Sequence, residues 1–266
     1  MLKQYKPTLD KLTKIVGKSH VLIDEQDTRH YRQGIRFGEG KVLAVVCPGT
    51  LLEQWQALQT IIEADCVVIM QAANTGLTGG STPYGDEYDR PVIIMSTRRL
   101  QGIQVILDGK QVVCLPGATL DNLERTLKPY NREPHSVIGS SCIGASVLGG
   151  VCNNSGGALV RRGPAYTEMA LYARVNESGE LELINHLGID LGNTAEEILT
   201  RLQKQDYETG QVTTQTTQLA SDNRYAHDVK QVDADSPARF NADPTRLYEA
   251  SGSAGKVCVF AVRLDT

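Results

Sequence analysis

The first hundred residues alternate between helical and strand spacing of their apolar positions. Residues 9–16 carry apolar side chains at three- and four-residue intervals, which predicts a helix. The apolar run 43–47 is followed by a Pro-Gly pair and predicts a buried strand that ends in a turn. Thr50 is a suitable cap for the next helix, and residues 66–70 form a second apolar run. We therefore expect a β-α-β unit, with a crossover of the length that a parallel strand pair needs. The expected apolar stripe of its helix is Leu51, Trp55, Leu58 and Ile62.

Beyond residue 90 the pattern predicts further elements and then a long polar stretch. Strands are expected at 92–95, 103–107, 111–115, 169–175, 181–184 and 256–264, and helices at 120–127 and 194–204. The strands at 169–175 and 181–184 are expected to form a hairpin with its turn at Ser178-Gly179. Residues 205–243 hold few large apolar side chains, so we expect a surface excursion or partial disorder there, with order returning at 245–249. Because the last strand nearly reaches the C-terminus, we interpret the chain as a compact domain that forms the front half of a longer protein.

The composition narrows the class of protein. The chain has 266 residues, a net charge of -4 and 41% hydrophobic residues, enough for one large or two modest domains. Its mild acidity argues against a nucleic-acid binder. No apolar run is long enough to span a membrane, and lysines interrupt residues 1–16, so we expect no secretory signal and place the chain inside the cell.

Six cysteines occur, and none forms a C-x-x-C pair. We therefore expect no zinc ribbon and no other metal site, and we expect reduced cysteines that pack as small hydrophobic residues.

The first segment suited to chemistry follows the strand at 66–70. Residues 71–81 contain Gly76, Gly79 and Gly80 among small or hydroxylated residues, and no lysine. Glycine lets a ligand approach the backbone closely, and successive N–H groups in such a loop form a concavity that binds anions. The lysine of a P-loop and the Rossmann glycine pattern are both absent. The loop alone therefore leaves two interpretations open, a phosphate site and a turn-rich surface loop.

A second small-residue segment spans 138–157. Helical apolar spacing at Ile143, Val147 and Val151 predicts a helix there, with small residues on its other positions. Small residues let a planar or extended ligand lie against a helix, and they also permit close helix–sheet packing. Two such segments in one chain favour a long ligand that contacts both.

The order of these segments resembles the FAD domain of the vanillyl-alcohol-oxidase type, and within it the family of bacterial respiratory, quinone-dependent D-lactate dehydrogenases. The resemblance covers nearly the whole chain. It is carried by ANTGLTGG at 73–80, REPHSVIGSSCIGASV at 132–147, RGPAYTEM at 162–169, NHLGIDLG at 185–192, ARFNADP at 238–244 and GSAGKV at 252–257.

The resemblance implies an α+β, PCMH-type FAD-binding domain of two α/β subdomains, at about 1–100 and about 101–266, with the substrate (cap) and membrane-binding parts absent. It implies non-covalent FAD, since the first loop lacks the His or Cys that some relatives use for covalent attachment. The cofactor-binding residues carried over by motif are Ala72, Ala73, Asn74, Thr75, Gly76, Gly80, Ser81, Gly139, Ser146, Gly156 and Val259.

The implied function is oxidation of D-lactate to pyruvate, with electrons passed to a quinone at the cytoplasmic side of the bacterial inner membrane, to which the protein would bind peripherally through parts outside this chain. Two alternatives stay open: a flavin-binding module that is inactive on its own, and a FAD oxidoreductase for another 2-hydroxy acid such as glycolate. Such a reaction needs a base, usually His, and a cation for the carboxylate. Of His20, His30, His135, His186 and His227, only His135, beside the second segment, merits a test, and Arg161 and Arg162 would either face the cofactor or solvate a turn. No catalytic residue is assigned.

Overall fold

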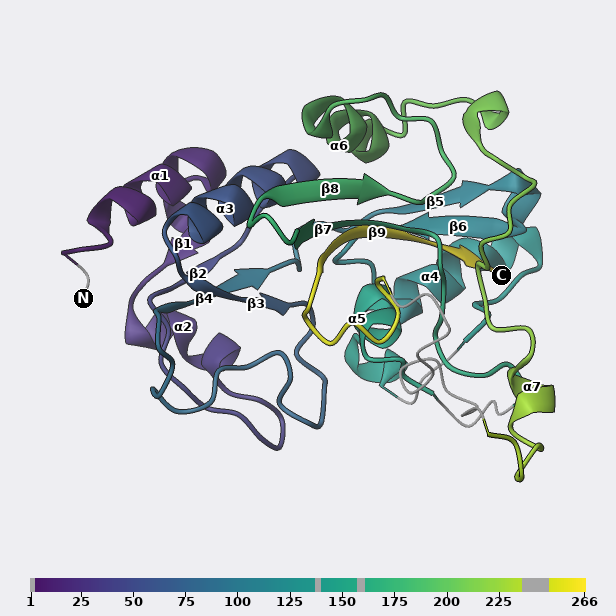
Figure 1. The fold of residues 1–266 in the computed structure, drawn as a ribbon, viewed down its shortest axis with the longest axis horizontal. Helices are drawn as coiled ribbons and strands as arrows, with labels where there is room; N and C mark the ends of the chain where they lie inside the picture. The colour runs from purple at the N-terminus through teal and green to yellow at the C-terminus, as the bar shows by residue number, and fades with distance from the viewer. Residues whose placement is uncertain (1–2, 137–139, 157–160, 236–248) are drawn as a thin grey trace. The chain divides into compact units, whose positions relative to one another are not determined.

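The computed structural model describes residues 3–136, 140–156, 161–235 and 249–266 (Figure 1). The chain divides into two compact units, Met1–Leu100 and Gln101–Thr266. Each unit has its own sheet, and the two are described separately.

The first unit is built on a four-stranded sheet. Its strands are β1 (Val21–Leu22), β2 (Ala44–Val46), β3 (Val67–Gln71) and β4 (Val92–Ser96), in the order β1-β2-β4-β3. β2 and β3 each pair with β4 in parallel, and β1 pairs with β2 antiparallel. The expected β-α-β unit is present, but its two strands are not neighbours as predicted, because β4 lies between them. All five residues of β4 are buried, and a parallel sheet places its most apolar strand at the centre.

Three helices accompany this sheet: α1 (Lys6–Val16), α2 (Glu25–Arg32) and α3 (Leu51–Glu63). The predicted apolar faces of α1 and α3 are buried, with one difference in α3. Ile62, predicted for the buried stripe, is only half-buried, and its neighbour Ile61 is fully buried instead. Thr50 caps α3 as expected, with its Oγ1 accepting from the N–H of Glu53 at 3.1 Å. No helix in the described ranges is long and apolar enough to cross a membrane.

The second unit is built on a five-stranded antiparallel sheet. Its strands are β5 (Ile103–Ile106), β6 (Gln111–Cys114), β7 (Ala170–Val175), β8 (Leu181–Asn185) and β9 (Cys258–Asp265), in the order β5-β6-β9-β7-β8. The predicted β7–β8 hairpin is confirmed. The last strand of the chain is the central one, because β9 pairs with both β6 and β7.

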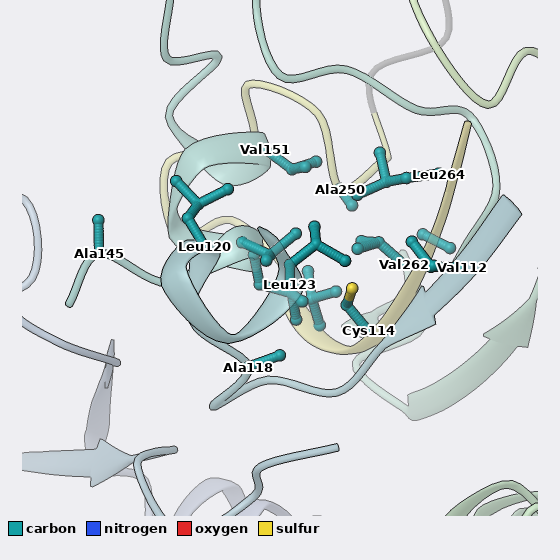
Figure 2. Packing of buried hydrophobic residues seen from close by; sticks show 14 of the residues in the cluster. Val112, Cys114, Ala118, Leu120, Leu123, Ala145, Val151, Ala250, Val262 and Leu264 are labelled. Carbon is teal, nitrogen blue, oxygen red and sulfur yellow. The ribbon is translucent and has the colours of Figure 1, made fainter. Parts of the chain in front are cut away.

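Helices cover both faces of this sheet (Figure 1). On one face lie α4 (Leu120–Leu127) and α5 (Val147–Cys152), whose apolar side chains pack onto β6, β7 and β9. Figure 2 shows Leu123 of α4 next to Cys114 of β6 and Val262 of β9. On the other face lies α6 (Ala195–Lys204), where the buried Gln104 donates to the carbonyl of Leu202 at 2.7 Å.

Short turns complete the described part of the second unit. They are η2 (Leu107–Gly109), η3 (Lys128–Tyr130), η4 (Ser141–Ile143), η5 (Thr209–Gln211) and α7 (Tyr225–Asp228), while η1 (Lys18–His20) belongs to the first unit. The polar stretch expected from residue 205 includes η5 and α7. Of the order predicted at 245–249, only Glu249 lies within the described residues.

Candidate functional site

The first glycine-rich loop leaves the sheet of the first unit at the end of β3. Because β2, β3 and β4 are parallel, their carboxyl ends share one edge of the sheet. Ligands of open α/β sheets bind outside this edge, where the loops emerge. The loop that holds Ala72, Ala73, Asn74, Thr75, Gly76, Gly80 and Ser81 therefore starts at the edge where a ligand is expected.

Three polar side chains of this loop hold the loop itself. Gln71, 2% exposed, donates from Nε2 to the carbonyls of Tyr31 and Ser81 at 2.8 and 2.6 Å, which joins the two ends of the loop. Asn74 donates to the carbonyl of Gln33 at 2.8 Å and accepts from the hydroxyl of Ser81 at 2.9 Å. The Ser81 proton is thus directed to Asn74. What the loop offers a ligand is its backbone together with its two threonine hydroxyls.

Two glycines of the loop have no structural reason among the residues that the structure describes. A Cβ added at Gly76 or Gly80 would meet no described atom within 4 Å, and neither residue has the positive φ that favours glycine. Both are exposed. Gly79 differs, with a φ of 74° and Phe37 O at 3.1 Å from its added Cβ. Gly76 and Gly80 therefore present bare backbone to open space, which is the form of an anion-binding loop.

The second segment is organised around the start of α5. Ser146 is buried and caps α5, accepting from the N–H of Gly149 at 3.0 Å. The helix does not begin at Ile143 as its spacing predicted. Gly144, with a φ of 84°, stops the preceding η4 turn, and Ile143 is left 59% exposed. The physical reason is local, since a left-handed residue cannot continue a right-handed helix.

The other cofactor-binding residues predicted in the second unit lie just after α5 and in β9. Backbone hydrogen bonds join the end of α5 to the stretch that leads into β9. The stretch before β9 is bonded to the end of α5, with Gly252 N–H donating to Val151 O at 3.0 Å and Ala254 N–H to Cys152 O at 2.9 Å. Gly156 is exposed just beyond α5. Val259 is buried in β9, opposite Tyr172, next to a shift in the β7–β9 register. Gly139 lies outside the described residues.

One side chain of this segment was not selected from the sequence. Asn154 is 1% exposed and has a φ of 47°, and within the described residues neither its Nδ2 nor its Oδ1 has a hydrogen-bond partner. Buried amides of this kind are rare in folded proteins. The only signal for it in the sequence was its position before the Gly156-Gly157 pair.

The histidine and arginines next to the second segment are engaged with the chain. His135 Nε2 lies 2.9 Å from the carbonyl of Arg162, and Arg162 donates to the carbonyl of Pro134 at 3.1 Å and pairs with Glu133. Arg161 is exposed. His135 also lines a mainly apolar crevice between α4 and α5. Among the described residues, none of those predicted to bind the cofactor lines this crevice. These contacts favour a structural role for His135 and Arg162.

A titratable cluster that the sequence did not single out lies beside β7. His186 Nδ1 is 2.5 Å from Glu249 Oε1, and the Glu249 side chain is only 5% exposed. Burial raises the pKa of Glu249, against the opposing effect of its hydrogen bond to His186. Burial, together with the charge of Glu249, also raises the pKa of Tyr172 to about 12.

All six cysteines lie within the described residues, and none forms a disulfide. Four are buried as predicted, whereas Cys142 is exposed and Cys152 partly buried. Burial raises the pKa of the Cys152 thiol to about 11, so it is almost entirely protonated at neutral pH.

Comparison of the sequence with known protein families identifies the family of this chain. The model of the FAD binding domain matches residues 42–182, more than half of the chain, and the chain belongs to this family of FAD-binding domains. FAD is thus its cofactor.

Full-length relatives share a single name. The chain is 62% identical over 258 residues to the quinone-dependent D-lactate dehydrogenase of Haemophilus influenzae, covering 97% of this chain and 46% of the relative. It is 58% identical over 261 residues to the protein of the same name from Escherichia coli, covering 98% and 46%. The chain therefore spans just under half the length of these relatives.

Solved structures agree on the fold. p-Cresol methylhydroxylase with bound substrate superposes with a TM-score of 0.55 at 17% identity, over 72% of this chain and 37% of that one. Alkyldihydroxyacetonephosphate synthase does so with a TM-score of 0.57 at 15% identity, over 74% and 37%. The predicted PCMH-type α+β fold is confirmed.

The residues present fit FAD on one observation made on this chain itself. Gly76 and Gly80 leave open space where a side chain would otherwise stand, so phosphate groups can reach the backbone of the first loop.

Proposed function

We propose that this chain is the FAD-binding part of an enzyme that oxidises D-lactate to pyruvate and passes the electrons to a membrane quinone. The observation that carries the proposal is the 62% identity to a quinone-dependent D-lactate dehydrogenase over 97% of the chain. The proposed place of the enzyme is the cytoplasmic face of the bacterial inner membrane, bound peripherally through parts outside this chain.

In this proposal the first loop holds the pyrophosphate. Backbone N–H groups of residues 72–76, together with those of Gly80 and Ser81, donate to phosphate oxygens. The side chains of Gln71, Asn74 and Thr82 stabilise the loop by donating hydrogen bonds to backbone carbonyls. Gly139, Ser146, Gly156 and Val259 follow the cofactor along its length. Since the Ser146 hydroxyl caps α5, its contribution comes from its backbone or through α5.

The chemistry divides between the cofactor and the protein. When bound, FAD supplies the acceptor for two electrons. Oxidation of D-lactate removes a hydride from C2 and a proton from the hydroxyl, so a protein base is needed as well. Residues 72–81 contain no titratable side chain, so this loop binds and orients without taking part in proton transfer. Non-covalent binding is supported by the absence of His and Cys from the loop and by the high pKa, about 11, of Cys152.

The test is to purify the chain, record its visible spectrum with and without added FAD, and then add D-lactate without oxygen. A flavin band that D-lactate bleaches, and L-lactate does not, is the expected result for a competent site. Bleaching by glycolate and not by D-lactate would assign a different 2-hydroxy acid. A flavin band that none of them bleaches would make this chain a binding module, an alternative favoured by its coverage of only 46% of the relatives.

A further inference from the structure

The first unit exposes a group of large apolar side chains on two neighbouring loops. Of the eleven large hydrophobic side chains that are exposed in the described part of the chain, five come from residues 33–40 and 76–88. Single exposed hydrophobic residues are ordinary, whereas a group of them marks a surface that binds a ligand or a partner. We call this group the apolar rim, and its members, between 37% and 79% exposed, are Ile35, Phe37, Leu77, Tyr84 and Tyr88.

Hydrogen bonds hold the two loops against each other. Gly85 N–H donates to Glu39 O at 2.8 Å, and the Thr82 hydroxyl donates to Phe37 O at 3.4 Å. A Cβ added at Gly79 would lie 3.1 Å from the same Phe37 oxygen. Both loops extend from the same side of the first unit's sheet (Figure 1). The apolar rim therefore belongs to one surface, and this surface borders the glycine-rich loop proposed to bind phosphate.

The turn that carries Ile35 and Phe37 is constrained by its backbone. Gly34 N–H donates to Gly38 O at 2.8 Å, which closes a turn around residues 35–37. Gly38 has a φ of 88°, and a Cβ added at Gly34 would overlap Phe37 O, so both positions need glycine. Because the backbone is fixed in this way, the exposure of the two apolar side chains is a built feature of the first unit.

A cationic hydrogen-bond donor stands between these two apolar side chains. Arg36 is exposed at the tip of the turn. Among the described residues, its guanidinium group makes no hydrogen bond and no ion pair. A guanidinium carries five N–H donors and no acceptor. The surface therefore combines apolar side chains with donors that are available to a ligand.

This combination matches the chemistry of a lipophilic quinone. A quinone has an apolar ring and tail, and its two carbonyl oxygens accept hydrogen bonds. Small-molecule sites are mainly apolar, with a few placed polar groups that fix the orientation of the ligand. The relatives at 62% and 58% identity are named quinone-dependent, and an acceptor has to approach the cofactor in order to be reduced. The apolar rim borders the loop proposed to hold that cofactor.

We propose that the apolar rim binds the quinone acceptor, with Arg36 donating a hydrogen bond to a quinone carbonyl. The inference rests on the proposed function and deepens it, because it assigns a surface to the second substrate. In the overall reaction, D-lactate loses a hydride from C2 and a proton from its hydroxyl. The quinone gains two electrons from the cofactor and two protons, and its two carbonyls become hydroxyls.

The first test measures binding of a short-chain benzoquinone, with one isoprenoid unit, to the chain by saturation-transfer NMR. The rim variant Ile35→Ser/Phe37→Ser is compared with Tyr130→Ser/Val232→Ser, which removes an exposed aromatic and an exposed aliphatic side chain from the second unit. We expect the Kd for the quinone to rise roughly tenfold for the rim variant and less than about twofold for the control. Arg36→Met should also weaken binding, because it removes the donor. Thermal unfolding should stay within a few degrees of the parent, since these side chains are exposed.

The second test follows electron transfer without using D-lactate. The FAD-loaded chain is photoreduced without oxygen and mixed with the same quinone or with ferricyanide, a water-soluble acceptor that needs no apolar surface. The quinone, below saturation, should reoxidise the rim variant roughly tenfold more slowly than the parent. The rate with ferricyanide and the Kd for FAD should not change. A chain that binds no FAD or oxidises no D-lactate refutes part of the proposed function, and the binding test still decides the inference.

Unchanged quinone affinity in a folded rim variant would overturn the inference, and so would an equal loss in the control variant or a parent chain that does not bind the quinone. Flotation with quinone-free phosphatidylcholine vesicles and sedimentation velocity identify other occupants of the apolar rim. If the rim variant loses vesicle binding or self-association while its quinone affinity is unchanged, the rim is a lipid contact or an interface between copies of the chain. Either result contradicts a quinone site.

Discussion

Replacing Gly76 or Gly80 with Val should abolish FAD binding while leaving the apo protein folded. The structure separates these two effects. A Cβ at either position meets no atom of the described part of the chain within 4 Å, and neither residue adopts a positive φ. The added side chain would therefore enter the open space next to the loop without displacing any part of the chain.

The substitutions should make the apo protein slightly more stable and should greatly weaken its binding of FAD. Where the backbone tolerates a side chain, replacing Gly stabilises the fold by about 0.4–1 kcal/mol, because the unfolded chain becomes less flexible. A phosphate oxygen must come within about 2.9 Å of a backbone nitrogen to accept a hydrogen bond, whereas carbon atoms need about 3.5–4.0 Å. A Val side chain thus holds the phosphate out of range. We expect the Kd for FAD to rise at least about a hundredfold, which is roughly 2.7 kcal/mol.

The assay is titration of the apo variants with FAD, paired with thermal unfolding in the absence of FAD. Gly38→Ala is the contrasting variant, because Gly38 has a φ of 88° and its added Cβ would lie 2.1 Å from Thr82 Oγ1. Gly38→Ala should lose roughly 2–5 kcal/mol of stability from strain and overlap. Folded Gly76→Val and Gly80→Val proteins that bind FAD with the affinity of the parent would refute the phosphate-loop reasoning.

Three further predictions concern the second unit. Arg263→Met should lower the unfolding free energy by roughly 3–5 kcal/mol, measured in urea, because Arg263 is 1% exposed and donates to Gln111 and to three backbone carbonyls that would lose their partner; a loss below about 1 kcal/mol would contradict this. Cys142 should be the first thiol alkylated near pH 8, with Cys152 slower by orders of magnitude because its pKa is about 11; peptide mass mapping that finds Cys152 modified first would contradict the burial. Burial raises the pKa of Glu249 in the folded protein above its ordinary value of 4.5. The folded protein therefore holds the Glu249 proton more tightly than the unfolded chain does, and protonated Glu249 stabilises the fold below pH 4.5. This stabilisation is lost as the pH rises from 4.5 through the higher pKa of the folded state. The stability of Glu249→Gln relative to the parent should therefore increase from below pH 4.5 toward neutrality, and a difference that does not change with pH would contradict the shift.

Much of the local structure could be predicted from the sequence because the signals are local. The cap at Thr50 and the apolar face of α1 depend on residues within a few positions of one another, and both are confirmed. The β7–β8 hairpin is confirmed for the same reason. The anion-binding role of the first loop stays a prediction, since it rests on the composition of the loop and on the strand before it.

The errors have non-local or conformational causes. The place of β4 between β2 and β3 depends on which strand is best buried on both faces, and the order of strands in the chain does not contain that information. The helix expected from Ile143 is stopped by the left-handed Gly144, although the apolar spacing continues across it. In the site, the bond from Ser81 to Asn74 and the unpaired amide of Asn154 appear only once the backbone places these groups.

The phosphate site proposed for the first glycine-rich loop depends on backbone rather than on charged side chains. A pyrophosphate accepts hydrogen bonds from any direction, so backbone N–H groups on a rigid loop suffice, and the side chains of Gln71 and Asn74 are used to make that loop rigid. Because residues 72–81 carry no charged side chain, the affinity that we propose for this loop depends on the shape of its backbone. The positions expected to matter most are then Gly76 and Gly80, where the absence of a side chain leaves the backbone open to a ligand.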